Sequence, residues 1–237
     1  MLKEEQFRRN LAEVLGKMKR LCDEFNRSPD ELTLLPVTKK WPSEAVRFCQ
    51  RAEIMRIGEN RVQDALVKQQ EIPGMSWELI GHLQSNKVNQ VIGRFERIQT
   101  VDSLKLLRKL QAGAEKKEVN CKILLQVNTG EDPAKYGFLS EQVDSAFEQA
   151  LSSSNLLVEG LMTIAPYAPE DPSVAKRTFV RLRDLRDRLN EDFNTDLKEL
   201  SMGMSGDLRE AIESGSTMIR IGSALFCLLY TSPSPRD

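Results

Sequence analysis

Short apolar runs recur along the chain, and each has the length and residue types of a β-strand. Between them lie longer stretches whose apolar residues are spaced three or four positions apart, as on one face of an α-helix. The two patterns alternate from residue 32 onward. The strand-like runs are LTLLPV at 32–37, IMRIG at 54–58, WELIG at 77–81, RIQTV at 97–101, KILLQVN at 122–128, LVEGLMTI at 157–164, ELSMG at 199–203 and TMIRIG at 217–222.

Eight strand and helix units in alternation predict an α/β protein, a single (β/α)8 TIM barrel, because eight such units close a parallel sheet on itself. A doubly wound open sheet is the competing fold. It would favour a glycine-rich first turn, whereas the first turn here is VTKKWPSE. The length of 237 residues is typical of one such barrel, so we expect a single folded domain.

Two segments lie outside the repeating pattern. Residues 4–26 carry apolar side chains at helical spacing, which predicts an additional N-terminal helix packed on the outside of the fold. The last residues, LLYTSPSPRD, switch to serine, proline and threonine. We therefore expect the barrel to span residues 1–226, and residues 227–237 to form a disordered or non-native tail.

Composition and charge narrow the function classes. The 34 basic and 35 acidic residues give a net charge of -1, which provides no field to attract nucleic acid or an anionic membrane. No apolar run approaches the ~20 residues of a membrane-spanning helix, and the N-terminus lacks the apolar core of a secretory signal. We therefore expect a cytoplasmic protein. The four cysteines are scattered and form no C-x-x-C pair, so no metal site is predicted.

Lys39 is the first residue that could carry chemistry. Barrel enzymes place their working groups at the C-terminal ends of the strands, and Lys39 follows the run LLPVT directly. Strand alternation can point its amine into the barrel mouth, where loss of water favours the neutral, nucleophilic amine that imine formation needs. Lys40 would then face outward. A strand-end lysine is more often a surface side chain, so this position alone leaves both interpretations open.

Two glycine-serine turns follow the last two strands. The seventh strand runs into MGMSGD and then LREAIESG, so Ser205 is a candidate N-cap of a helix whose free backbone N–H groups, with Gly206 beside it, suit a phosphate. The eighth strand leads into Gly222 and Ser223. Loops after strands seven and eight are the recurrent phosphate site of this architecture. Ordinary capping explains each turn separately but not their joint placement.

Three further polar residues accompany the strands. Arg220 lies between two isoleucines and should face away from them, inward, where an unpaired charge is costly. Its partner is either the pyridine nitrogen of a cofactor or a barrel carboxylate. His82 follows the third strand, a placement more typical of a hydrogen-bonded structural residue than of a catalytic base. Asn60 follows the second strand and could bond a cofactor or neighbouring backbone.

Eight ordered motifs cover nearly the whole chain: VTKKWP, IGENRVQDALVK, WELIGHLQSNKV, TVDSLKL, LLQVNTGEDPAKYGF, GLMTIAP, LSMGMSGDLREAI and GSTMIRIGSALF. Together they resemble the YggS/PROSC family of pyridoxal phosphate homeostasis proteins. The resemblance implies a barrel like the N-terminal domain of alanine racemase, with pyridoxal 5′-phosphate (PLP) bound to Lys39 as a Schiff base. The ending FCLLYTSPSPRD departs from the family, which usually continues from the ALF-like segment into Gly and Arg.

The resemblance also implies the remaining cofactor contacts. It places Asn60 near the ring and Arg220 at the pyridine nitrogen. It places the phosphate between the pairs Ser205–Gly206 and Gly222–Ser223. His82 is included among the candidate cofactor-binding residues, and no residue is given a catalytic role.

These contacts bear on what the protein does with PLP. An arginine at the pyridine nitrogen keeps that nitrogen unprotonated, which makes the ring a weaker electron sink and disfavours transamination while leaving imine exchange open. Alanine racemases add a second domain and a partner-subunit tyrosine as the opposite-face base. This chain ends where the barrel ends, so we expect no such second base.

The resulting expectation is a monomeric, PLP-binding protein without robust catalysis. It would carry or buffer PLP, regulate vitamin B6 and amino-acid and keto-acid homeostasis, and have PLP-dependent apo-enzymes as recipients. Two alternatives stay open at this point. One is a low-activity PLP-dependent amino-acid racemase, and the other is a Schiff-base aldolase acting on a phosphorylated sugar, which uses the same barrel and lysine.

Overall fold

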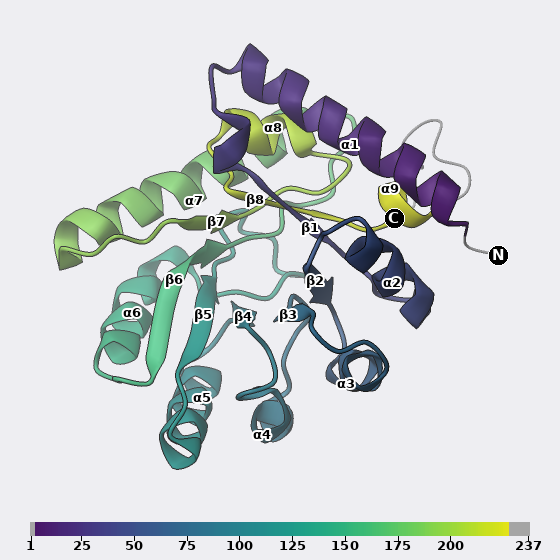
Figure 1. Cartoon of the computed structure of the whole chain (residues 1–237). Helices are drawn as coiled ribbons and strands as arrows, with labels where there is room; N and C mark the ends of the chain where they lie inside the picture. Colours follow the sequence, from purple (N-terminus) through teal and green to yellow (C-terminus); the bar gives the residue numbers. More distant parts are fainter. Residues whose placement is uncertain (1–2, 228–237) are drawn as a thin grey trace.

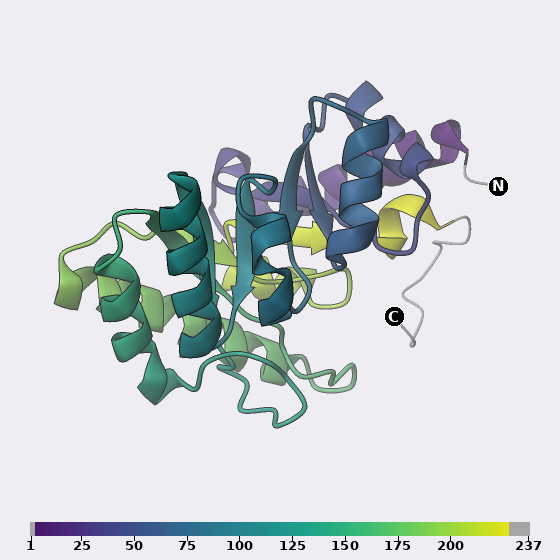
Figure 2. The ribbon, with the colours of Figure 1, turned by 90° about the horizontal axis from the view of Figure 1, so that it is seen from below.

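The computed structural model describes residues 3–227 and contains one sheet of eight parallel strands. All eight predicted strands are present, and six of them stop one or two residues before the apolar run ends, because those last residues already belong to the loops. Both views show the strands in the middle with helices outside them (Figure 1, Figure 2). The strands are β1 (Thr33–Pro36), β2 (Arg56–Glu59), β3 (Ser76–Leu79), β4 (Arg97–Val101), β5 (Cys121–Gln126), β6 (Leu156–Met162), β7 (Glu199–Ser201) and β8 (Met218–Ile221).

The helices follow the strands in the predicted alternation. The longest, α7, begins where the Asp171 side chain accepts a hydrogen bond from Ser173 N, and it ends at Asn194 in a left-handed conformation (φ 50°). The short α4 was not predicted. The helices are α1 (Glu4–Glu24), α2 (Ser43–Arg51), α3 (Val62–Glu71), α4 (Val88–Val91), α5 (Leu104–Lys117), α6 (Val143–Leu151), α7 (Pro172–Phe193), α8 (Leu208–Glu213) and α9 (Ser223–Phe226), with 3-10 turns η1 (Pro29–Glu31), η2 (Ser85–Lys87) and η3 (Ser140–Gln142).

The sheet closes on itself between β1 and β2. On one side β1 pairs with β8 over its whole length, from Thr33 opposite Met218 to Pro36 opposite Ile221. On the other side a single parallel bridge, Val37 to Gly58, joins β1 to β2, and Thr38 N donates to Gly58 O at 3.1 Å. A strand with a neighbour on each side has no free edge, so the barrel is confirmed and the open sheet is excluded. This narrow seam adjoins Lys39.

The additional N-terminal helix is also confirmed. In Figure 1, α1 lies along the outside of the barrel against α8 and α9. The Phe7 ring stacks on Phe226 with centroids 5.4 Å apart, and the buried Asn10 donates from Nδ2 to Leu225 O at 3.0 Å. The apolar face of α1 therefore covers the point where the last described helix meets the barrel.

Apart from Cys227, which ends α9, the predicted tail of residues 227–237 lies outside the described residues. Within residues 3–227, no helix has both the length and the apolar character needed to span a bilayer.

Candidate cofactor site

The direction in which Lys39 leaves β1 follows from a small apolar cluster inside the barrel. Leu35 and Val37 pack there with Ile80 and Met218, separately from the larger core between sheet and helices. Residues two apart on a strand share a face. Alternation from Leu35 and Val37 would direct Lys39, two residues beyond Val37, toward the mouth of the barrel.

The neighbouring strands show the same alternation. A side chain at Gly58 would approach Ile80 Cδ1 within 3.1 Å, so position 58 faces the interior and Asn60 follows it by two residues. His82 follows Ile80 by the same step. Arg220 is buried, at 4% exposure, and bonds to groups inside the barrel. Arg220 thus faces the interior, and Lys39, Asn60 and His82 each follow an inward-facing residue by two positions, at the C-terminal end of their strands.

The two glycine-serine turns lie on either side of β8. Arg220 N donates to Gly203 O at 3.0 Å, which ties the turn after β7 to β8. A side chain at Gly222 would come within 3.1 Å of Val37 O, so the turn after β8 lies against β1. Gly203 has φ +101°, and a Cβ there would lie 2.3 Å from Ala211 Cβ, which only glycine avoids. Because β7, β8, β1, β2 and β3 are consecutive neighbours, all predicted site residues gather at one end of the barrel.

The N-cap role predicted for Ser205 is wrong. Helix α8 begins at Leu208, and the residue before it is Asp207, whose Oδ1 accepts a hydrogen bond from Met204 N at 2.6 Å. A carboxylate accepts more strongly than a hydroxyl and closes the turn on itself. Burial raises the pKa of Asp207, and the Met204 N–H bond opposes that rise.

The turns nevertheless keep free donors. The backbone N–H groups of Ser205, Gly206 and Ser223 donate to no other group in residues 3–227. Adjacent unpaired N–H groups in such turns suit an anion. The phosphate site is therefore supported by the turns themselves and not by the short helix α8.

Of the two interpretations left open for Lys39, the structure favours the exposed one, because both Lys39 and Lys40 are exposed. The ladder of β1 ends at Pro36, and Trp41 N donates to Thr38 O at 3.1 Å, which turns the chain at the mouth. Lys40 has φ +63° in this turn. Lys39 therefore lies in an exposed turn just beyond the C-terminal end of β1.

Beneath Lys39 lies a buried ion pair that the sequence analysis missed. Lys68 of α3 pairs with Glu59 of β2 and donates to Thr38 O at 2.8 Å. Thr38 Oγ1 donates to Glu59 Oε1 at 2.7 Å, and Asn60 N donates to Glu59 Oε2 at 3.2 Å. One carboxylate thereby holds both the residue before Lys39 and the backbone of Asn60.

A signal for this pair was present in the sequence. Lys68 occupies the same helical face as Val62, Ala65 and Ile72, all of which are buried. A lysine on the apolar face of a predicted helix requires a buried partner. The identity of that partner, Glu59, depends on how α3 packs on β2.

The polar groups at the mouth fit an anionic, heteroaromatic ligand. Asn60 Oδ1 is buried and has no hydrogen-bond partner among the described residues. Arg220 donates from Nη1 to Ser201 Oγ at 2.7 Å and from Nη2 to Thr163 O at 3.0 Å. No described carboxylate forms an ion pair with it, so the structural ion pair considered above is not found. Burial lowers the pKa of Arg220 to about 10, with Asp207 opposing the shift.

His82 is bonded as a structural residue would be. Its Nδ1 lies 2.8 Å from Asp102 Oδ2, and its ring stacks on Tyr136 with centroids 4.1 Å apart and an interplanar angle of 15°. Tyr136 belongs to the loop between β5 and α6. His82 therefore links the loop after β3 to the loop between β5 and α6.

Comparison with known proteins first defines the class. The family described as "Alanine racemase, N-terminal domain" matches residues 18–229. The solved alanine racemase of Clostridium difficile 630 shares the fold, with a TM-score of 0.77 and 14% identity over 93% of this chain and 56% of that one. The protein is thus a barrel of the alanine racemase type.

More similar relatives then identify the family. The pyridoxal phosphate homeostasis protein of Aquifex aeolicus is 37% identical over 218 residues, which is 91% of this chain and 95% of the relative. PipY of Synechococcus elongatus PCC7942, solved with PLP bound, has a TM-score of 0.78 and 33% identity over 88% of this chain and 99% of that one. The chain therefore belongs to the family of pyridoxal phosphate homeostasis proteins, as its motifs indicated.

Proposed function

We propose that this protein binds PLP at the barrel mouth and carries or buffers it, and thereby regulates vitamin B6 and amino-acid and keto-acid homeostasis. The supporting observation is the meeting of the predicted residues on five neighbouring strands at one end of the barrel. A relative of 33% identity solved with PLP bound adds independent support.

Each residue is assigned one contact. When bound, PLP supplies an aldehyde carbon that Lys39 Nζ can attack, forming a Schiff base with loss of water. The N–H groups of the turns at Ser205–Gly206 and Gly222–Ser223 bind the phosphate. Asn60 contacts the ring through its unpaired amide, and His82 bounds the site through its loop contact.

Arg220 is assigned to the pyridine nitrogen, and this contact favours a carrier over an enzyme. A guanidinium only donates hydrogen bonds, so the nitrogen facing it must act as an acceptor and stay unprotonated. The ring then withdraws electrons weakly, which disfavours chemistry through a carbanion. A racemase would also need a second acid-base group opposite Lys39. We further propose that the protein is cytoplasmic and monomeric and that PLP-dependent apo-enzymes are its recipients.

The test compares the wild type with Lys39→Ala and Lys40→Ala after incubation with PLP. The wild type and Lys40→Ala should be yellow, with a visible band that borohydride removes while fixing the mass of reduced PLP on Lys39. Lys39→Ala should bind PLP without that band or that mass. A modified residue other than Lys39 would refute the assignment.

A chiral assay separates the carrier from the racemase. PLP-loaded protein incubated with L-alanine should leave its enantiomeric purity unchanged, because a second base is absent from the assignment. Steady appearance of D-alanine that depends on Lys39 would overturn the carrier proposal in favour of catalysis.

A further inference from the structure

The interior of this barrel contains a polar layer. Barrels of this class usually fill their interior with layers of branched apolar side chains. Here Glu78 of β3, Gln99 of β4 and Ser201 of β7 are fully buried, and Arg220 of β8 is 4% exposed. Buried polar groups are costly unless each is hydrogen bonded. The hydrogen bonds of this layer therefore need an explanation.

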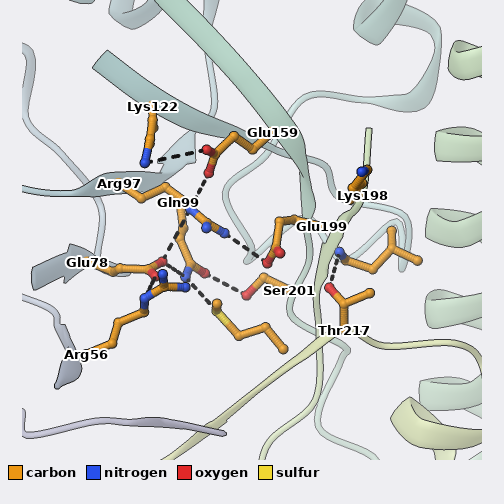
Figure 3. A network of polar contacts seen from close by, with 12 residues as sticks. Arg56, Glu78, Arg97, Gln99, Lys122, Glu159, Lys198, Glu199, Ser201 and Thr217 are labelled. Atoms are coloured by element: carbon orange, nitrogen blue, oxygen red, sulfur yellow. Dashed lines mark hydrogen bonds and ion pairs between the residues drawn. The ribbon is translucent and has the colours of Figure 1, made fainter. Parts of the chain in front are cut away.

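The bonds form one chain that begins at Arg220. Arg220 Nη1 donates to Ser201 Oγ at 2.7 Å, and Ser201 Oγ donates to Gln99 Oε1 at 2.6 Å. Gln99 Nε2 then donates to Glu78 Oε2 at 2.5 Å. Figure 3 shows the bonds that Gln99 makes with Ser201 and Glu78.

With Glu78 ionised, the donors and acceptors of the side chains allow only this direction. Arginine is a donor only, so the Ser201 oxygen accepts from Arg220 and its single proton goes to Gln99. If the Gln99 amide were rotated, its oxygen would face the Glu78 carboxylate, acceptor against acceptor. Each bond therefore polarises the next in the same sense, with the carboxylate at one end and the guanidinium at the other.

The far end of the chain is anchored. Glu78 lies 3.4 Å from Arg56 Nε and 3.8 Å from Arg97 Nε. Arg97 in turn pairs with Glu159 at 2.8 Å and Glu199 at 2.9 Å, as the close-up shows (Figure 3). These ion pairs hold the Glu78 carboxylate in place. Glu78 thereby orients the Gln99 amide, and Gln99 orients the Ser201 hydroxyl that accepts the hydrogen bond from Arg220.

Arg220 needs such support. Its guanidinium is buried and forms no ion pair with a described carboxylate, although Asp207 acts on it at longer range. Its other bond goes to the Thr163 carbonyl. The Ser201 hydroxyl accepts more strongly from a charged donor when it donates its own proton to Gln99, because that bond raises the electron density on its oxygen.

We propose that Ser201, Gln99 and Glu78 form a positioning relay that orients Arg220 and its charge toward the pyridine nitrogen of PLP. This inference rests on the proposed function. None of the three residues touches PLP, and each acts through Arg220.

The test uses Gln99→Leu and Ser201→Ala, which break the relay, beside Glu199→Gln, which changes the same polar network but has its one ion pair among the described residues with Arg97. Affinity for PLP should fall about tenfold in both relay variants and stay at the wild-type value in Glu199→Gln. With PLP labelled at the ring nitrogen, ¹⁵N NMR at saturating PLP should show an unprotonated nitrogen in the wild type and a protonated fraction in the relay variants.

A background variant separates positioning from general packing. In an Arg220→Gln background, adding Gln99→Leu should cause no further change in the ¹⁵N signal, because the relay then has nothing to position. Relay variants that behave like Glu199→Gln, or a loss that persists in the Arg220→Gln background, would overturn the relay. Ser201→Ala removes a single oxygen and carries the test if Gln99→Leu does not fold.

The same samples distinguish the two levels of the proposal. If borohydride fixes no PLP on Lys39 of the wild type, the proposed function fails and the relay with it. If the wild type is modified and the relay variants match the control, only the relay is wrong.

Discussion

Two buried polar networks support the candidate site from opposite sides of the sheet, and they are built differently. The outer pair, Glu59 and Lys68, lies between the sheet and α3 and holds the backbone next to Lys39. The inner network lies inside the barrel and supports Arg220 through the hydroxyl of Ser201. It consists of Glu78, Gln99 and Ser201 with the charged side chains Arg56, Arg97, Lys122, Glu159 and Glu199.

The networks differ in redundancy and in access to water. In the outer pair the side chains of Glu59 and Lys68 are 0% and 8% exposed, and each is the other's only charged partner among the described residues. In the inner network Arg97 has several carboxylate partners, and the outermost member, Lys122, is 39% exposed. Removing one charge from the Glu59–Lys68 pair should therefore lower the stability of the protein severely. Removing one charge from the inner network should lower it less, because water and the remaining ion-pair partners compensate there.

Lys68→Met should have the largest effect on stability. It keeps the apolar stem of the side chain but leaves Glu59 buried and uncompensated, which costs about 3–5 kcal/mol. Urea unfolding measures the loss. The double variant Glu59→Gln with Lys68→Met should recover part of it, because no unpaired charge remains. A single variant as stable as the wild type would show that Glu59 finds another partner.

Arg97→Met should have an intermediate effect. Arg97 is the buried centre of the inner network. Two of its carboxylate partners, Glu159 and Glu199, are partly open to water, and the third, the buried Glu78, keeps Arg56 as a partner. We expect a loss of about 2 kcal/mol in the free energy of unfolding, smaller than for Lys68→Met. A loss larger than that of Lys68→Met would show that the inner network tolerates the loss of a charge less well than the Glu59–Lys68 pair.

Lys122→Met should have a small effect that salt removes. Lys122 pairs with Glu96 and with Glu159 at 3.9 Å, at the exposed end of the inner network. Exposed ion pairs contribute about 0.5 kcal/mol, and salt screens them. Unfolding at low and high ionic strength should show the difference shrinking. A difference that is independent of salt would indicate a packing role for the lysine stem.

The stability of the protein should change with pH because of Glu78. Burial raises the pKa of Glu78 above 4.5, opposed by Arg97, Gln99 and Arg56. A raised folded-state pKa gives stability that is full below the unfolded value and is lost as pH rises through the folded value. The stability of the wild type relative to Glu78→Gln should therefore fall as pH rises from about 4.5 toward neutrality. Urea unfolding across that range checks the sign, and a rising difference would contradict it.

The strands and the end of the barrel that carries the site were predictable because they depend on local pattern. Period-two alternation correctly placed Arg220 on the inner face, and the order of the strands placed the two glycine-serine turns together. The N-cap of α8 was predicted wrongly and the exposure of Lys39 stayed open, because both depend on packing as well as on local pattern. Asp207 took the position predicted for Ser205 because its carboxylate closes the turn on Met204. The β1 ladder ended early enough to leave Lys39 exposed in the turn beyond the strand.

What this sequence determines by itself is where each strand runs and which of its residues face inward, since both follow from neighbours along the chain. Only the tertiary structure decides which inward groups meet. Gln99 and Ser201 bond although they lie 102 positions apart, and Thr38 and Glu59 meet across the seam that closes the barrel. Such contacts depend on closure of the whole sheet, and the energetic penalty on unpaired buried groups then selects the partners.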